Sequence, residues 1–246
     1  MFSIKTRRSI RKYADRDVSN ELLSSLLEEA ERTQTMENLQ LYSVVVTRKE
    51  EDKKALAPFH INQPMISQAP VVLTFLADLN RMSTWCECRK ARPGYGNFLS
   101  FLNAATDALL YCQTFCNLAE DRGLGLCYIG TTIYNPKGII NALELPKLVM
   151  PVATITIGWP AENPKQSDRL PLTAIMHEGH YVKATPESID QYYAEKEARP
   201  ENKEFVRINE KENLAQVFTD CRYKQSDCEA MSESLLGALK QQGFLE

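Results

Sequence analysis

Residues 98–122, FLSFLNAATDALLYCQTFCNLAEDR, decide how this chain folds, because they form its longest helical pattern. Apolar side chains occupy nearly every side of the predicted helix, and Gly123 follows at the position where glycine ends many helices. A helix that is apolar all round is buried in a large core or in an interface between subunits. In a chain of 246 residues, the pattern favours a central helix that is shared with a second copy.

Apolar strands and shorter helices are predicted on both sides of this helix. The strands are expected at residues 41–47, 71–77, 124–129 and 152–157. Helices are expected at residues 20–30, 50–56, 135–143 and 185–198, with two more before the end of the chain. Residues 79–97 are expected to be irregular and to form a lid, and residues 199–208 a charged loop. This order of elements indicates an α/β or α+β domain with a buried sheet.

Composition and charge narrow the class of protein. Hydrophobic residues make up 43% of the chain and charged residues 25%, the balance of a globular protein, and the net charge is −3. A negative net charge argues against nucleic acid as the main partner. No apolar run approaches the roughly 20 residues of a membrane span, and no apolar leader opens the chain, so a cytoplasmic protein is expected.

Several sequence motifs of other protein classes are missing. No GxGxxG motif follows the first predicted strand, and no GxxxxGK(S/T) motif occurs, which disfavours a Rossmann domain and a P-loop nucleotide hydrolase. The seven cysteines are odd in number and lack zinc-ligand spacing, so neither a disulfide framework nor a metal site is expected.

A basic cluster near the N-terminus is the exception in this acidic chain. Arg7, Arg8, Ser9 and Arg11 lie within five positions. The guanidinium group presents a planar fork of donors that fits a phosphate bidentately, and the serine adds a hydroxyl donor. The cluster therefore suits one small anionic ligand, although a solvated basic arm would have the same sequence.

Five segments, in order along the chain, resemble the flavin-dependent nitroreductases, and specifically their NADPH-preferring, oxygen-insensitive branch. They are RRSIRKYAD at residues 7–15, TQTMENLQ at 33–40, Gln63 followed by ISQAP at 66–70, GLGLCYIG at 123–130, and GWPA, NP and RLP between residues 158 and 171. The resemblance implies a three-layer α/β/α fold of the α+β class. In that fold a mostly antiparallel sheet is flanked by helices, and two copies form an intertwined dimer. It also implies an FMN-binding core at residues 1–185 and a C-terminal helical extension at 186–246, packed on the core or on the partner.

The same resemblance implies which residues bind the cofactor, FMN. The phosphate and the O2 edge of the ring would be held by a first group: Arg7, Arg8, Ser9, Arg11 and Arg169. The ribityl chain or the ring edge would be held by Thr35, Asn38 and Gln63, and the turn beside the ring would be formed by Tyr128, Ile129, Gly130 and Thr131. No side chain is expected to act as a catalytic group, because the flavin carries the chemistry. Electrons would pass by a ping-pong route from NADPH or NADH to nitroaromatics, quinones or flavins.

The sequence also departs from the family pattern, which leaves alternatives open. Thr131 stands where the branch has a second glycine, and Ser167 where it often has a lysine, for which Lys165 could substitute. Residues Arg199, Lys203 and Arg207 could meet the 2′-phosphate of NADPH or form a solvated charged loop. A flavin protein of the same fold with a dehalogenase-like or non-catalytic role, and a basic-arm interaction protein without flavin, remain the competing hypotheses.

Overall fold

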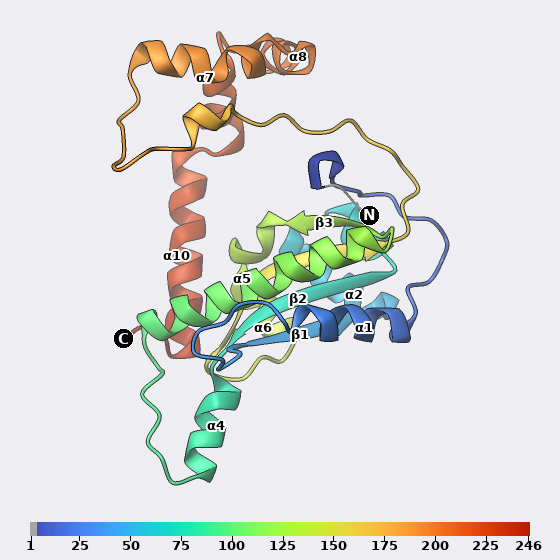
Figure 1. Cartoon of the computed structure of the whole chain (residues 1–246), viewed down its shortest axis with the longest axis vertical. Coiled ribbons are helices and arrows are strands. Elements are labelled where there is room, and N and C mark those ends of the chain that lie inside the picture. Colours follow the sequence, from blue (N-terminus) through green and yellow to red (C-terminus); the bar gives the residue numbers. More distant parts are fainter. Residues whose placement is uncertain (1–3) are drawn as a thin grey trace. The chain divides into compact units, whose positions relative to one another are not determined.

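A four-stranded sheet forms the centre of the computed structural model, which describes residues 4–246 (Figure 1). The strands β1 (Tyr42–Thr47), β2 (Val71–Asp78), β3 (Gly125–Ile129) and β4 (Val149–Gly158) lie in the order β1-β2-β4-β3. All three pairings between neighbouring strands are antiparallel. The predicted class, an α+β fold with an antiparallel sheet, is therefore confirmed.

The two central strands are buried at every position, which explains why their sequences are continuous apolar runs. Side chains of β2 alternate between the two faces of the sheet, with Val71, Leu73 and Phe75 on one side and Val72 on the other. The strands β1 and β3 form the two edges. Helices must therefore cover both faces, as the predicted three layers require.

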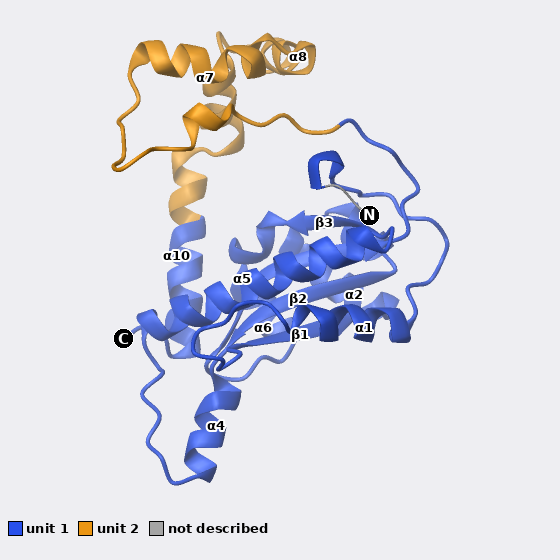
Figure 2. Cartoon of the chain, in the orientation of Figure 1, with its two compact units in different colours: residues 1–165, 231–246 blue, residues 166–230 orange. Residues whose placement is uncertain are grey.

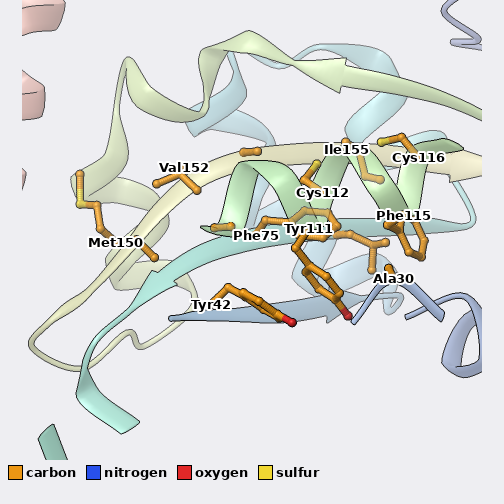
Figure 3. Packing of buried hydrophobic residues seen from close by; sticks show 14 of the residues in the cluster. Ala30, Tyr42, Phe75, Tyr111, Cys112, Phe115, Cys116, Met150, Val152 and Ile155 are labelled. Atoms are coloured by element: carbon orange, nitrogen blue, oxygen red, sulfur yellow. The ribbon is translucent and has the colours of Figure 1, made fainter. Parts of the chain in front are cut away.

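One face of the sheet is covered by α1 (Asn20–Ala30) and by the long helix α5 (Phe98–Asp121) (Figure 1). The Ser19 hydroxyl accepts a hydrogen bond from the Leu22 N–H and begins α1, while Gly123, with a φ of +83°, ends α5. Figure 3 shows the larger core, where Tyr42 stacks on Tyr111 with ring centroids 4.2 Å apart. Two cysteines of α5, Cys112 and Cys116, are buried in this core.

The opposite face carries shorter elements. They are α2 (Glu50–Leu56), the 3-10 helix η2 (Ala57–His60), α3 (Pro64–Gln68) and α6 (Pro136–Ala142). A smaller apolar cluster fills the space between them and the sheet: Leu56, Met65, Ile66, Val72, Cys127, Ile129 and Ile139. A 3-10 turn, η3 (Gly130–Ile133), continues directly from β3 on this side.

Two segments that the sequence predicted as irregular are helical. Residues 80–88 form α4 (Asn80–Cys88), and residues 200–208 form α8 (Pro200–Ile208). The first prediction was wrong because Pro93, Gly94 and Gly96, which follow α4, were taken as a loop signal for the whole stretch. The second was wrong because charged residues were taken as such a signal. Pro200 lies at the first position of α8, where its fixed φ and missing N–H are compatible with a helix.

The chain divides into two compact units (Figure 2). The first consists of residues 1–165 and 231–246, and the second of residues 166–230. The second unit contains helices and short turns: η4 (Leu172–Ala174), α7 (Pro186–Ala198), α8, α9 (Leu214–Val217) and the π-helical turn η5 (Phe218–Arg222). A capping box at Thr185 begins α7. The last helix, α10 (Gln225–Gln242), begins in the second unit and ends in the first, where Ala238 and Leu239 join the core. The predicted division into an FMN-binding core at residues 1–185 and a helical extension at residues 186–246 stays a prediction.

Candidate functional site

The N-terminal arm that carries the arginine cluster lies along the edge strand β3. The Ile10 N–H donates to the Leu126 carbonyl oxygen over 2.9 Å, and the Tyr13 hydroxyl lies 2.7 Å from Thr156 Oγ1. Gly125 makes this approach possible, since a Cβ there would lie 2.7–2.9 Å from the Ile10 side chain. The arm is therefore a fixed extension of the sheet rather than a solvated tail.

Arg8 of the arm lines a surface cavity of about 370 Å³, together with Glu120 and Glu162. Arg8 donates from Nη1 to the Pro164 carbonyl oxygen at 3.3 Å and also bonds to Asn163 Oδ1. Glu162 Oε1 accepts from the N–H groups of Arg11, at 2.6 Å, and Lys12, at 3.0 Å. These N–H groups lower the pKa of the Glu162 carboxyl. The arm and residues 162–164, which the sequence placed in two separate motifs, are thus joined.

Arg7 and Arg11 approach groups at the base of this arm. Arg7 Nη1 lies 3.9 Å from Glu120 Oε1 at the end of α5. Burial raises the pKa of Glu120, and the charge of Arg7 acts in the opposite direction. Burial likewise raises the pKa of the Cys127 thiol, against the charge and hydrogen bond of Arg11. Arg7 therefore lies beside a carboxyl group at the end of α5, and Arg11 lies near a buried thiol of β3.

A second group of predicted site residues meets at the other end of β3. Thr131 Oγ1 lies 3.3 Å from Gln63 Nε2 and 3.1 Å from Nδ1 of His60. Ile129 is buried, whereas Tyr128 is 49% exposed and its partial burial raises its pKa to about 12. At Gly130 an added Cβ would meet no atom of the described chain within 4 Å. The turn thus presents open space beside a fixed set of polar groups.

Thr35 and Asn38 lie in a third region, the loop that precedes β1. Their loop is held by Asp107 of α5, whose carboxylate accepts from the N–H groups of Met36, at 2.9 Å, and Leu41, at 3.2 Å. The loop leads into β1, at the edge of the sheet opposite β3. Asn38 has a φ of 57°, a left-handed conformation that asparagine tolerates better than most residues. Within one protomer, the structure does not join these two residues to the β3 groups.

Arg169 belongs to the second unit, where its Nη1 donates to the Asp168 carbonyl oxygen at 2.7 Å. Two of the three basic residues considered for a 2′-phosphate are ion-paired in the same unit. Arg199 pairs with Glu195 at 3.0 Å, and Arg207 pairs with Glu204 at 2.6 Å. A role for Arg169 or for these residues in binding stays a prediction.

Residues 4–246 contain no group of three or more His, Cys, Asp or Glu side chains that could hold a metal ion. None of the helices described is long and apolar enough to cross a membrane.

The model of the nitroreductase family matches residues 4–159, which include the whole sheet and both ends of β3. The chain belongs to the nitroreductase family. It is 36% identical over 182 residues to an FMN reductase (NAD(P)H) of Bacillus subtilis, a match that covers 73% of each protein. It is 32% identical over 174 residues to an oxygen-insensitive NADPH nitroreductase of Salmonella typhimurium, covering 71% of each. The crystal structure of an inferred oxidoreductase from Bacteroides fragilis has a TM-score of 0.98 at 57% identity, with 99% of both chains covered.

The residues around β3 fit the FMN that this nitroreductase family implies. A phosphate requires charged donors, and the arm, which is held to β3 at Ile10, carries Arg8 at the cavity and Arg11 three residues further along. A flat ring can pack closely against backbone that carries no side chain. Gly130 offers such a position, because an added Cβ there would meet no described atom within 4 Å. FMN, when bound, would supply the capacity to accept and donate a hydride.

Sequence reasoning missed two residues of this nitroreductase that act on predicted site residues. His60 is fully buried and contacts Thr131, and Asp107 is fully buried and holds the loop of Thr35 and Asn38. Asp107 could have been found, because a lone carboxylate in an otherwise apolar helix needs buried donors. For His60 the sequence carries no comparable signal.

Proposed function

We propose that this chain is an FMN-dependent NAD(P)H oxidoreductase. It transfers hydride by a ping-pong route from NADPH or NADH, via FMN, to nitroaromatics, quinones or flavins. The observation that carries the proposal is the pair of donor groups at the two ends of β3, with arginines at one end and the Gln63–Thr131 turn at the other. The identity of 36% to an FMN reductase supports the same reaction.

The chain's own residues bind and orient in this proposal, and none donates or removes a proton in the reaction. The phosphate and the O2 edge of the ring would be held by Arg7, Arg8, Ser9, Arg11 and Arg169. Gln63 would hold the ribityl chain or the ring edge, and the turn beside the ring would be formed by Tyr128, Ile129, Gly130 and Thr131. Residues 1–185 would then hold the cofactor core and residues 186–246 the helical extension, in a cytoplasmic enzyme.

A homodimer explains why Thr35 and Asn38 lie apart from the other predicted residues. One face of α5 is exposed and apolar, with Leu99, Leu102 and Leu109 between 42% and 68% exposed. Their spacing of three and seven residues places them on one stripe. A large exposed apolar stripe is typical of an interface between subunits, and a two-fold dimer is the commonest assembly. The loop of Thr35 and Asn38 packs on this same helix through Asp107, and we place it beside the cofactor of the partner in this dimer.

An anaerobic titration of the purified protein with NADPH tests the reaction. We expect a yellow protein with flavin absorbance that bleaches as NADPH or NADH is added. A protein without flavin that also binds no added FMN would favour the basic-arm interaction protein. A yellow protein that neither nucleotide bleaches would favour a flavin protein with a different reaction.

Steady-state kinetics test the order of the transfer. If donor and acceptor use one site in turn, double-reciprocal plots at several acceptor concentrations are parallel lines. Intersecting lines would show that both substrates are bound together and would contradict the ping-pong route.

A further inference from the structure

The Gln63 amide reaches the interior of the protein through a short hydrogen-bonded chain. Gln63 Nε2 lies 3.3 Å from Thr131 Oγ1, which lies 3.1 Å from His60 Nδ1. His60 is 0% exposed and Thr131 is 7% exposed. The chain ends there, because no described residue hydrogen-bonds to His60 Nε2. Such a chain connects a half-buried site residue to a buried imidazole that the proposed reaction does not use.

The backbone between His60 and Gln63 is strained in a way that brings both side chains to the same hydroxyl. Ile61 has φ 56° and ψ 35°, and Asn62 has φ 49°, so two consecutive residues are left-handed. A left-handed conformation is unusual for a β-branched residue and persists only where the surrounding structure enforces it. Strain of this kind clusters at functional sites.

The hydrogens along this chain are decided by counting unsatisfied groups. If Gln63 donates to Thr131, the threonine hydroxyl can donate to Nδ1, and only the His60 Nε2–H lacks a partner. If His60 instead donated from Nδ1 while Gln63 also donated, both the Thr131 O–H and the Nε2 lone pair would lack partners. Each unsatisfied buried group costs about 1–3 kcal/mol, so with the Gln63 nitrogen facing Thr131, as it does in the structure, the first arrangement is favoured.

We propose that His60 is a positioning residue that, through Thr131, fixes the orientation of the Gln63 amide. The Gln63 nitrogen is held by Thr131, and its carbonyl oxygen is left to accept a hydrogen bond from bound FMN. The isoalloxazine N3–H and the ribityl hydroxyls are the donors that FMN offers to such an acceptor. The inference rests on the proposed function, and it makes Thr131, which departs from the glycine of the family pattern, a functional substitution.

Binding of FMN to the apoprotein, followed by quenching of flavin fluorescence, tests this role. Thr131→Val removes the hydroxyl and keeps the shape, so we expect the Kd for FMN to rise about three- to tenfold. Thr131→Ser should remain within about twofold of the wild type. Thr132→Val is the matched control, because Thr132 is equally buried but bonds to the Ile129 carbonyl oxygen at 2.9 Å.

A double-mutant cycle shows whether His60 acts through Thr131. His60→Leu should weaken FMN binding, and His60→Leu/Thr131→Val should bind no more weakly than Thr131→Val alone. Additive effects, or a Thr131→Val protein with the wild-type Kd, would overturn the inference. Should His60→Leu fail to fold, Thr131→Val and Thr131→Ser still decide it.

The tautomer of His60 separates this inference from the proposed function. In ¹⁵N-histidine-labelled apoprotein at neutral pH, NMR should show a neutral His60 with its proton on Nε2. A proton on Nδ1 would reverse the chain and overturn the inference even if FMN binds well. A wild-type protein that binds no FMN would overturn the proposed function. In that case the tautomer of His60 would still show which way the Gln63 amide is oriented.

Discussion

Arg8 and Arg11 hold the arm in different ways, and both are predicted to bind phosphate. Arg8 is tied to residues 163 and 164, and Arg11 acts on the Cys127 thiol. Replacing either residue by alanine removes a charge-assisted hydrogen bond worth about 1.5–3 kcal/mol. The Kd for FMN should therefore rise about tenfold or more, as measured by fluorescence titration.

The matched control for this pair is Lys12→Ala. Lys12 is an exposed basic residue of the same arm whose N–H, and not its side chain, is bonded to Glu162. It should bind FMN nearly as the wild type does. If Arg8→Ala and Arg11→Ala also bind with the wild-type Kd, the phosphate does not lie at this cluster.

Gly130 gives a test of where the flat ring lies. Because no described atom would contact an added Cβ, Gly130→Ala should unfold at the same denaturant concentration as the wild type. If the ring of FMN occupies that space, the same substitution should weaken FMN binding about tenfold or more through steric overlap. Unchanged binding and unchanged stability together would place the ring elsewhere.

At the scale of residues, the sequence indicated candidate site residues only where they stand in short linear motifs. The arginine cluster and the Gly130–Thr131 turn were found in this way, and the structure places them at the two ends of β3. His60 and Asp107 were missed because each acts on a residue about 70 positions away. Their partners depend on how the sheet is ordered, which no local pattern contains.

Among the elements, the contact between the arm and β3 depends on one small residue. A Cβ at Gly125 would lie within 2.9 Å of three atoms of Ile10, which is itself buried. Gly125→Ala should therefore push the arm outward and destabilise the protein by about 1–3 kcal/mol in chemical denaturation. FMN binding should weaken at the same time, because the arm carries the arginines.

Gly94→Ala is the control for this prediction, since an added Cβ there would meet no described atom within 4 Å. It should change neither stability nor FMN binding. A Gly125→Ala protein with wild-type stability and affinity would mean that the arm is not held by this contact.

Elements with one dominant signal were predicted well from the sequence. The apolar run at residues 71–77 is β2, and the proline after Thr185 begins α7 with a complete capping box. The elements that were missed, α4 and α8, are rich in charged and polar residues and bury little surface. α4 is short and mostly polar, and the apolar face of α8 is hidden among charged residues that also suit a loop.

On the scale of the whole molecule, the apolar stripe of α5 predicts that the protein is a dimer. Leu102→Lys or Leu109→Lys would place a charge in the centre of the proposed interface, where burial of an unpaired charge is strongly unfavourable. Light scattering should show a shift from dimer to monomer at micromolar concentration, with loss of bound FMN. Asp52→Lys, at an exposed position of α2, should remain a dimer.

A flavin-loaded wild-type monomer under the same conditions would contradict the dimer. The sequence predicted that the helix at 98–122 would be buried on all sides, and the protomer leaves several of its leucines exposed. A partner subunit that covers these leucines would reconcile the prediction with the structure. The sequence of one chain cannot establish this, because an apolar pattern does not say whether its surface is buried in the same copy or against another.

The pH dependence of folding should reveal the buried His60. Burial lowers the pKa of His60 from 6.5 to about 4, so the folded protein keeps it neutral where the unfolded chain takes up a proton. Stability contributed by the neutral form is present above pH 6.5 and is lost as the pH falls toward 4. Between pH 7 and pH 5 the loss attributable to His60 is about 2 kcal/mol.

Denaturant unfolding of the apoprotein at these two pH values measures this loss, with His60→Leu as the comparison. Glu120 has a raised pKa, so its contribution has the opposite sign and is lost as the pH rises, but it is present in both proteins and cancels in the difference. The wild type should therefore lose about 2 kcal/mol more than His60→Leu between pH 7 and pH 5. His180→Gln, which alters an exposed histidine, should keep the wild-type loss. Equal losses in the wild type and His60→Leu would mean that the pKa of His60 is the same in the folded and the unfolded protein, and would contradict the expectation that burial keeps the imidazole neutral.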